Sequence, residues 1–145
     1  MSTANAEAPA VGARELVAAM LDAENQADWE TWASLVAADV IIDHPTAGPT
    51  VGIAENLALI RRFREAADDY QRDVFDLVCD DTSAAFRFAI TGVLARPLGG
   101  GSEIEVTGQT FEIAGAAFVT TWGGRVVRIV EILTTNTLRS TAGER

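Results

Sequence analysis

The sequence has very little cysteine and histidine, with one residue of each, Cys79 and His44, in 145. A single cysteine excludes an internal disulfide framework and fits a reducing compartment, so we expect a cytoplasmic protein. A zinc site needs a cluster of nitrogen and sulfur ligands, which one histidine and one cysteine do not supply, so we expect no metal site. Cys79 has no basic neighbour in sequence that would activate its thiol, and we interpret it as a packing residue.

Long apolar runs and an excess of positive charge are also missing. No window approaches the ~20 apolar residues of a membrane-spanning helix, so we expect no membrane association. Residues 1–12 lack the basic start and the apolar segment of a secretory signal, and we expect them to form a disordered tail. The net charge of -10 argues against nucleic-acid binding, in which neutralised phosphates supply most of the affinity.

Two motifs of nucleotide and acyl chemistry are absent. The glycine run at residues 99–101 lies in an expected hairpin loop and opens no helix, so it is no phosphate-binding loop. The chain has no Gly-x-Ser-x-Gly nucleophile elbow either, and we expect it to work without a cofactor. Its length and its hydrophobic content of 48% predict a single globular domain at residues 13–138, followed by a C-terminal tail at 139–145.

Apolar residues recur at helical spacing in the first half of the chain. They predict three helices, at residues 15–26, 29–36 and 53–66. A strand is predicted at residues 40–44, where β-branched residues precede His44 at the strand end. The segment that follows, at 45–52, contains two prolines and two glycines and predicts a turn.

The second half of the chain alternates as strands do, and it predicts an antiparallel sheet. Four strands are expected, at residues 71–79, 84–94, 109–122 and 125–135. Residues 103–107 lead into the third of these, and Gly123-Gly124 is a tight hairpin turn. The strand at 84–94 is almost continuously apolar, so we expect both its faces to be covered, one of them by a second copy in a homodimer.

Three helices followed by long strands predict an α+β fold. The sheet should be mixed only where the early strand joins it, because hairpins connect the other strands. A curved sheet that closes over helices makes a cone with an internal pocket.

Several segments carry a resemblance to a known superfamily over residues 15–138. They are residues 25–36 followed at once by Asp39-Val40-Ile41-Ile42-Asp43-His44-Pro45, Gly52 at a helix start, Val106-Thr107-Gly108, and Gly123-Gly124-Arg125-Val126-Val127-Arg128-Ile129-Val130-Glu131. On these segments the chain resembles the nuclear-transport-factor-2-like superfamily, which includes ketosteroid isomerases, limonene-type epoxide hydrolases and SnoaL-like polyketide cyclases. The resemblance implies the cone fold and leaves the activity open, because this fold hosts both enzymes and non-catalytic binders.

The resemblance to ketosteroid isomerases puts Met20 at the position of their tyrosine, His44 at that of their base and Ala116 at that of their oxyanion-hole aspartate. Two apolar residues among these three argue against steroid isomerisation by that mechanism. The acid that SnoaL-like cyclases carry after the last strand is absent from residues 135–137.

The epoxide hydrolase pattern has an Arg-x-Asp on a middle strand and an aspartate on the last strand. The resemblance puts Arg87-Phe88-Ala89 and Glu131 at these positions, so the carboxylate that would protonate the epoxide is replaced by Ala89.

Glu131 is the first candidate for chemistry. Alternate residues of a strand share a face, so Glu131 should point with Val127, Ile129 and Leu133. A carboxylate among apolar side chains is usable as a general base or acid near neutral pH. The alternative is a structural ion pair with an arginine such as Arg87, or a subunit contact.

His44 and its neighbours form the second candidate group. Its imidazole could relay a proton or polarise a substrate carbonyl, and the resemblance places it inside the cone with Glu131. Asp43 has the opposite parity and either orients His44 or is solvated. Arg87 either sets the charge state of Glu131 or binds an anionic group; otherwise its stem packs and its head reaches solvent. A structural cap is the plain alternative for His44.

The expected lining of the pocket combines these groups with apolar side chains from several elements. It comprises Met20, Trp32, Ala116, Phe118, Ile129 and Leu133, with Trp29 and Tyr70 at the entrance.

The leading hypothesis is a cofactor-independent enzyme that acts on an apolar small molecule by proton transfer, as an isomerase, a cyclase or an epoxide hydrolase. Glu131 is the base, His44 the relay, and Arg87 and Asp43 assist them. The alternative is a non-catalytic small-molecule-binding or dimeric interaction module of the same fold.

Overall fold

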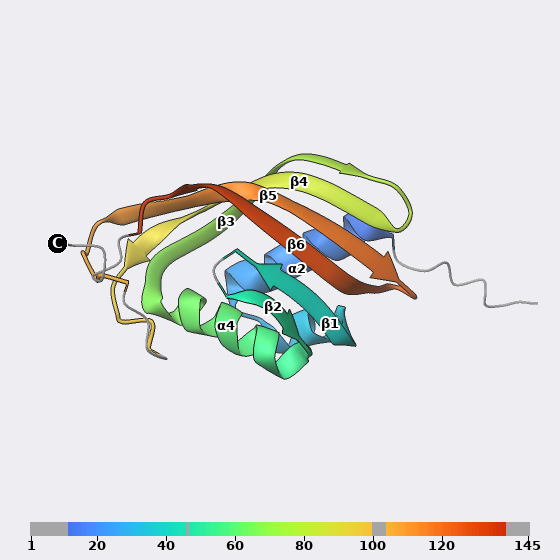
Figure 1. Ribbon diagram of the computed structural model, residues 1–145, viewed down its shortest axis with the longest axis horizontal. Helices are drawn as coiled ribbons and strands as arrows, with labels where there is room; N and C mark the ends of the chain where they lie inside the picture. Colours follow the sequence, from blue (N-terminus) through green and yellow to red (C-terminus); the bar gives the residue numbers. More distant parts are fainter. Residues whose placement is uncertain (1–11, 46, 100–103, 139–145) are drawn as a thin grey trace, which may run out of the picture.

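The computed structural model describes residues 12–45, 47–99 and 104–138, and it confirms the α+β architecture expected from the sequence (Figure 1). In chain order the elements are α2 (Ala13–Gln26), α3 (Trp29–Ser34), β1 (Val36–His44), β2 (Gly48–Val51), α4 (Ile53–Ala66), β3 (Ala67–Cys79), β4 (Ser83–Leu94), β5 (Thr110–Trp122) and β6 (Arg125–Asn136). The tails expected at residues 1–11 and 139–145 lie outside the described residues, as do Thr46 and residues 100–103.

All the strands belong to one six-stranded sheet with the order β2-β1-β6-β5-β4-β3. Neighbouring strands are antiparallel except β1 and β6, which are parallel, so the sheet is mixed where the early strand joins it, as predicted. The sheet is curved and open, and α2 and α4 lie against its concave side (Figure 1). This arrangement is the cone expected from the sequence.

The helix α3 begins where the local sequence favours a start. Asp28 caps α3, since one of its carboxylate oxygens accepts a hydrogen bond of 3.2 Å from the Thr31 backbone N–H. The helix is short, and Trp32 anchors it in the core with 1% of its surface exposed. The described helices include none with the length and apolar character that crossing a membrane requires.

The turn predicted after His44 contains a further strand, β2, which is a correction to the sequence analysis. Gly48 pairs with His44 and Pro49 with Asp43 in an antiparallel register. Because β2 lies at the edge of the sheet and has β1 as its only neighbour, Pro49 interrupts no second ladder.

The limits of two other strands also differ from the prediction. β3 begins at Ala67 and not at residue 71, and Asp69 inside it adopts a φ of 55° at an irregularity in the pairing with β4. Residues 104–107 do not form an extended strand: Ile104 makes a single bridge, and β5 begins at Thr110. Tertiary pairing rather than local periodicity decides these limits.

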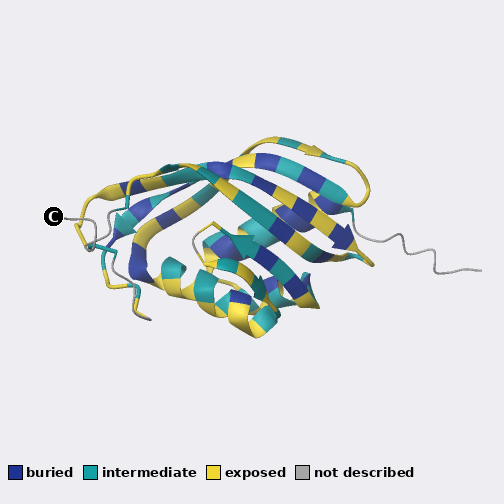
Figure 2. Cartoon of the chain, viewed as in Figure 1, coloured by how far each residue is buried: buried dark blue, intermediate teal, exposed yellow. Residues whose placement is uncertain are grey.

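The sheet has one buried face, and the alternation is visible along each strand in Figure 2. On β4, Phe86, Phe88 and Ile90 are buried, whereas Arg87 between them is exposed. Within this chain, therefore, one face of β4 is covered, and the second cover expected from the apolar sequence would have to come from another copy. The buried side chains form the core together with those of α2, α3 and β1.

Two irregularities in the pairing of β5 with β6 change the alternation along the last strand. They lie between Ala114 and Gly115 and between Thr120 and Thr121. Because of the second, Val126 and not Val127 is buried in the core with Ile129. A bulge of this kind re-aims the side chains that follow it, and here these include Glu131.

The irregularity at Gly115 leads to the first prediction. A Cβ atom at this position would lie 2.0 Å from the Ile132 carbonyl oxygen, a backbone atom that cannot move without shifting β6. We expect Gly115→Ala to lower the free energy of unfolding by about 2–3 kcal/mol in urea denaturation. Gly12→Ala is the control, since its nearest atom is the end of the flexible Glu15 side chain; because Gly12 is the N-cap of α2, the substitution should still cost up to about 1 kcal/mol. Equal effects of the two substitutions would contradict the close packing of β5 on β6.

Candidate active site

A cavity of about 740 Å³ lies between the concave side of the sheet and the helices. Its walls are mainly apolar, and they include Met20, Trp32, Phe86, Phe88, Ile129 and Leu133. Seven polar residues also line it, namely Glu24, His44, Arg62, Tyr70, Arg72, Glu131 and Asn136. A largely apolar cavity with a few convergent polar groups is the usual form of a small-molecule site.

The polar groups are organised around Arg72, which lies on β3. Its Nη2 donates to Glu131 Oε2 on β6 at 2.7 Å, and its Nη1 lies 3.5 Å from Glu24 Oε2 on α2. All three side chains are shielded from solvent, with 13% of the Arg72 side chain, 16% of Glu131 and 9% of Glu24 exposed. One guanidinium on β3 therefore serves two shielded carboxylates, one from α2 and one from β6.

Arg72 stays charged in this setting. Burial by itself would lower the pKa of Arg72, but the carboxylates of Glu131 and Glu24 outweigh it and raise the pKa above its ordinary value. The guanidinium also stacks over the Phe88 ring at 4.4 Å from the ring centre, a favourable contact for a desolvated cation.

The side chain of Asn25 fixes the position of Arg72 on the sheet. It accepts a hydrogen bond of 2.8 Å from the Arg72 backbone N–H and donates one of 3.0 Å to the Arg72 carbonyl oxygen. Since Asn25 lies near the end of α2, this pair of bonds joins the helix to β3 beside the cavity.

Tyr70 completes the cluster on the inner face of β3. Its hydroxyl donates to Glu24 Oε2, and only 8% of the residue is exposed. Burial raises the pKa of Tyr70 well above its usual value of 10.0, and the negative charge of Glu24 raises it further, while Arg72 partly offsets both. Tyr70 is thus a proton-bearing donor inside the cluster, and not the entrance residue expected from the sequence.

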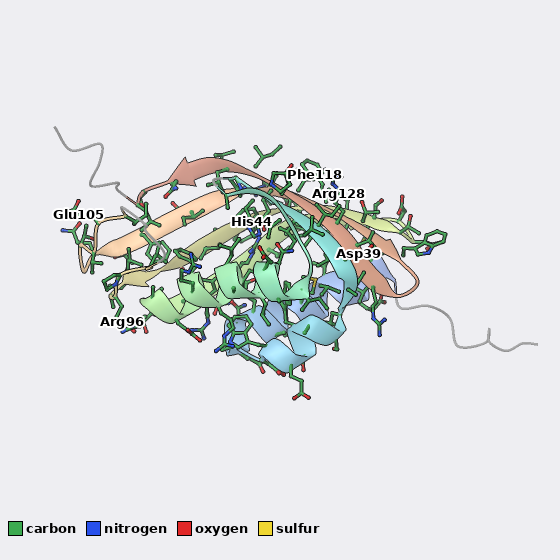
Figure 3. All side chains as sticks on the ribbon, turned by 60° about the horizontal axis from the view of Figure 1, so that its bottom comes forward. Asp39, His44, Arg96, Glu105, Phe118 and Arg128 are labelled. Atoms are coloured by element: carbon green, nitrogen blue, oxygen red, sulfur yellow. The ribbon has the colours of Figure 1, made fainter. Side chains whose placement is uncertain are left out.

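His44 reaches the cavity from the end of β1 and lies beneath the sheet in Figure 3. Its Nε2 forms a hydrogen bond of 2.9 Å with Oδ1 of Asn56 on α4. The structure therefore brings His44 and Glu131 to the same cavity, and it gives each of them a separate partner.

Arg87 and Asp43 lie on the other side of the sheet, which corrects their expected placement. Arg87 Nε contacts Asp76 Oδ2 at 2.7 Å in an exposed ion pair, and it is not near the cavity. Asp43 pairs with Val130 on the outer face and does not orient His44. The arginine that contacts Glu131 is Arg72, because strand parity turns Arg87 outward while Arg72 shares the inner face with Tyr70.

Ala116 and Phe118 also point away from the cavity. On β5 the buried residues are Phe111, Ala117 and Val119, whereas Phe118 is 47% exposed. Alternation showed which residues share a face but not which face is inner, and a shift of one position exchanges the two. Met20, Trp32, Ile129 and Leu133, the other predicted pocket residues, do line the cavity.

The sequence analysis missed Glu24, Arg72 and Asn56. A signal existed for Glu24, since it lies four residues after Met20 and therefore on the same helical stripe. A signal existed for Arg72 as well, because it alternates with Tyr70 and Val74. Among the described residues, no group of three or more His, Cys, Asp or Glu side chains is placed to hold a metal ion.

A model of the SnoaL-like domain family matches residues 17–129, which is most of the chain. The chain belongs to this family. No curated protein sequence matches it closely enough to count as a relative.

Solved structures of related proteins have the same fold as this SnoaL-like chain. A candidate polyketide cyclase from Pseudomonas putida KT2440 is 26% identical, with a TM-score of 0.69 over 86% of this chain and 92% of that one. A candidate ketosteroid isomerase from Kribbella flavida DSM 17836 is also 26% identical, with a TM-score of 0.63 over 84% of this chain and 77% of that one. An LEH-like epoxide hydrolase from M. tuberculosis is 12% identical, and its TM-score of 0.64, over 83% of this chain and 76% of that one, shows a shared fold.

The buried and the exposed arginine pairs give the second prediction. Arg72→Met removes the cation between two buried carboxylates, so we expect it to lower the free energy of unfolding at neutral pH by about 3–5 kcal/mol. Arg87→Met is a matched control on the neighbouring strand, because Arg87 also contacts a carboxylate at 2.7 Å but in solvent. It should cost about 0–1 kcal/mol. Urea denaturation of both variants measures the difference, and similar losses would show that the Arg72 cluster is not buried.

Tyr70 gives the third prediction, because it is the only tyrosine in the chain. In the unfolded chain the Tyr70 hydroxyl should ionise at about pH 10, whereas in the folded protein it keeps its proton to higher pH. The folded state then binds more protons than the unfolded state, so stability is present below about pH 10 and falls as the pH rises above it.

Tyrosinate absorbance in the near ultraviolet measures this directly. In the native protein we expect the tyrosinate signal to appear only at the pH at which the protein unfolds. In denaturant it should appear near the ordinary pKa of tyrosine. Tyr70→Phe should lose less stability in alkali than the wild type. A native titration at the ordinary pKa would show that Tyr70 is not buried against Glu24.

Proposed function

We propose that this SnoaL-like chain is a cofactor-independent enzyme that transfers protons on an apolar small molecule inside the cavity. One observation carries the proposal: Glu131, a shielded carboxylate held by Arg72, lies in the wall of a mainly apolar cavity that His44 also lines. A shielded carboxylate and an imidazole are the two side-chain types most used as general bases and acids.

Glu131 is the proposed base. Only its Oε2 is bonded to Arg72, and no donor among the described residues contacts its Oε1, which can therefore accept a proton from a substrate carbon or from a water molecule. With both carboxylates ionised, Glu24, Arg72 and Glu131 together carry one net negative charge. When Glu131 takes up a proton, a neutral Glu24–Arg72 pair remains.

His44 is the proposed second proton carrier, and it delivers or removes a proton at another atom of the substrate. Isomerisation, aldol-type cyclisation and epoxide opening all need a base and a second polar group of this kind. The candidate isomerase and cyclase among the similar structures, and the epoxide hydrolase that shares the fold, support this range of reactions. A reducing, cytoplasmic location is part of the proposal, and the single cysteine supports it.

The fourth prediction concerns Glu131. The probes are a β,γ-unsaturated ketone for isomerisation and styrene oxide for epoxide opening. On a probe that the wild type turns over, we expect Glu131→Gln to lower kcat by about 10²–10⁴-fold, since the amide keeps a bond to Arg72 but cannot accept a proton. The control is Glu112→Gln, an exposed acid on the neighbouring strand, which should keep full activity.

Two outcomes of this assay would contradict the proposal. Full turnover by Glu131→Gln would show that another group is the base. Tight binding of both probes without any chemical change would favour the alternative, a non-catalytic small-molecule-binding module of the same fold.

We also propose that the outer face of the sheet forms a homodimer. Phe118 and Ile132 are 47% and 54% exposed, and they lie on neighbouring strands of this face. Figure 3 shows Phe118 and Arg128 on the side of the sheet away from the helices. The same face carries the negative Asp43 and the positive Arg128, so two copies related by a two-fold axis can place side chains of opposite charge around an apolar centre.

The fifth prediction tests this dimer by light scattering at micromolar concentration. We expect the wild type to be a dimer and Phe118→Glu to be a monomer, because a charge at the apolar centre is costly to bury. Val106→Glu, a charge at an exposed apolar residue outside the strands, is the control and should remain a dimer. A monomeric wild type would contradict the proposal.

A further inference from the structure

Asn56 is a buried polar residue that the proposed chemistry does not use. It lies in the first turn of α4 with 0% of its surface exposed. Its Nδ2 donates hydrogen bonds to the carbonyl oxygens of Gly52 at 2.8 Å and Thr50 at 3.0 Å, and the Val40 carbonyl lies 3.4 Å away. The other polar atom of its side chain, Oδ1, lies 2.9 Å from His44 Nε2.

These contacts fix the orientation of the amide. Backbone carbonyl oxygens are acceptors only, so the group that faces them must be the NH₂ group of Asn56. The atom that faces His44 is then the amide oxygen, which is also an acceptor only. The bond between them needs one proton, and Nε2 of His44 must carry it.

The proton on Nε2 also determines the state of the other ring nitrogen, Nδ1. A neutral imidazole has one N–H, so when Nε2 carries it, Nδ1 has a free lone pair. The His44 side chain lines the cavity, and no group in the described part of the chain forms a hydrogen bond with Nδ1. This nitrogen is the one that remains for a molecule in the cavity.

The chemical nature of the partner also matters. An aspartate at this position would place a negative charge beside the imidazole, whereas the neutral amide orients the ring by a hydrogen bond alone. Asp43 does not supply that charge either, since it lies on the outer face of the sheet. When His44 takes a proton at Nδ1, Nε2 still donates to Asn56, so the ring keeps its place in both states.

We propose that Asn56 is a positioning residue that fixes His44 in the Nε2–H tautomer, and that Nδ1 of His44 is thereby the proton acceptor for a molecule in the cavity. The inference rests on the proposed function for its second half, because an acceptor is useful only if protons move in the cavity. The first part, the Nε2–H tautomer of His44, concerns the ring alone and can be measured without a substrate.

The test uses the fact that His44 is the only histidine in the chain. In untagged full-length protein labelled with ¹⁵N-histidine, every imidazole nitrogen signal belongs to this residue. Under conditions where the ring is neutral, we expect a protonated Nε2 and an unprotonated Nδ1, with no second tautomer. A spectrum dominated by Nδ1–H, or an exchanging mixture of both tautomers, would overturn the inference.

The variant Asn56→Ala tests whether Asn56 is the group that fixes the tautomer of His44. We expect the folded variant to show a mixture of tautomers, while Glu55→Ala, at an exposed position of the same helix, keeps the wild-type spectrum. A folded Asn56→Ala protein with an unchanged tautomer would overturn the role of Asn56. If this variant does not fold, the wild-type spectrum decides the tautomer by itself.

Kinetics on a probe that the wild type turns over separate this inference from the proposed function. We expect His44→Gln, whose amide still donates to Asn56, and Asn56→Ala to lower kcat by about tenfold or more, with a smaller change in KM. Full activity of both variants on a probe that Glu131→Gln cannot convert would overturn the acceptor role of His44 and leave Glu131 as the proposed base. Full activity of Glu131→Gln alone would overturn the proposed base and leave the assignment of His44 supported.

Discussion

The charge of Arg72 is the constraint on which the interior of this protein depends. Its guanidinium lies between Glu24 and Glu131, and these three residues come from a helix and from two strands that are not neighbours in the sheet. Taking three charges out of water costs several kcal/mol per ion unless they neutralise one another, so the cluster specifies an arrangement more than it adds stability. The helix α2, the strand β3 and the strand β6 must meet in one geometry for the cavity to exist with these groups in its wall.

Backbone contacts around the cluster support that geometry. Asn25 joins the end of α2 to the backbone of β3 at Arg72, and Arg64 on α4 donates to the carbonyl oxygens of Glu24 and Asn25. The carbonyl groups at the end of a helix need partners, and here the partner is a side chain of the other large helix. The same bonds that complete α2 therefore hold both helices at the edge of the cavity.

The two faces of the sheet have separate chemistry. The inner face carries the charged cluster and His44 in an apolar surround, while the outer face carries exposed apolar side chains and the solvent-exposed pair of Arg87 with Asp76. Bulges in β6 make this separation possible, because they turn Val126 as well as Ile129 inward over a short length of strand. A regular strand would have turned one of these two residues toward the outer face.

The sequence by itself determined the local elements and the fold family. The limits of α4, the cap at Asp28 and the Gly123-Gly124 hairpin follow from periodicity and turn chemistry, which act over a few residues. It also singled out Glu131 and His44, because a lone carboxylate in an apolar strand and a single histidine at a strand end are visible in one dimension. The resemblance to a superfamily added the cone around them, which the family match and the structure confirm.

Only the tertiary structure decided which groups meet these residues. The partner of Glu131 is Arg72, 59 positions away, and the partner of His44 is Asn56 on a different element. Alternation predicts which side chains share a face, but it does not say which face is inner, so Phe118 was expected in the pocket although it lies on the outer face. Ala116, placed by the resemblance, and Asp43, whose parity is opposite to that of His44, also lie outside the cavity. Strand order, register and bulges settle these points, and they depend on pairing between distant segments that no local pattern encodes.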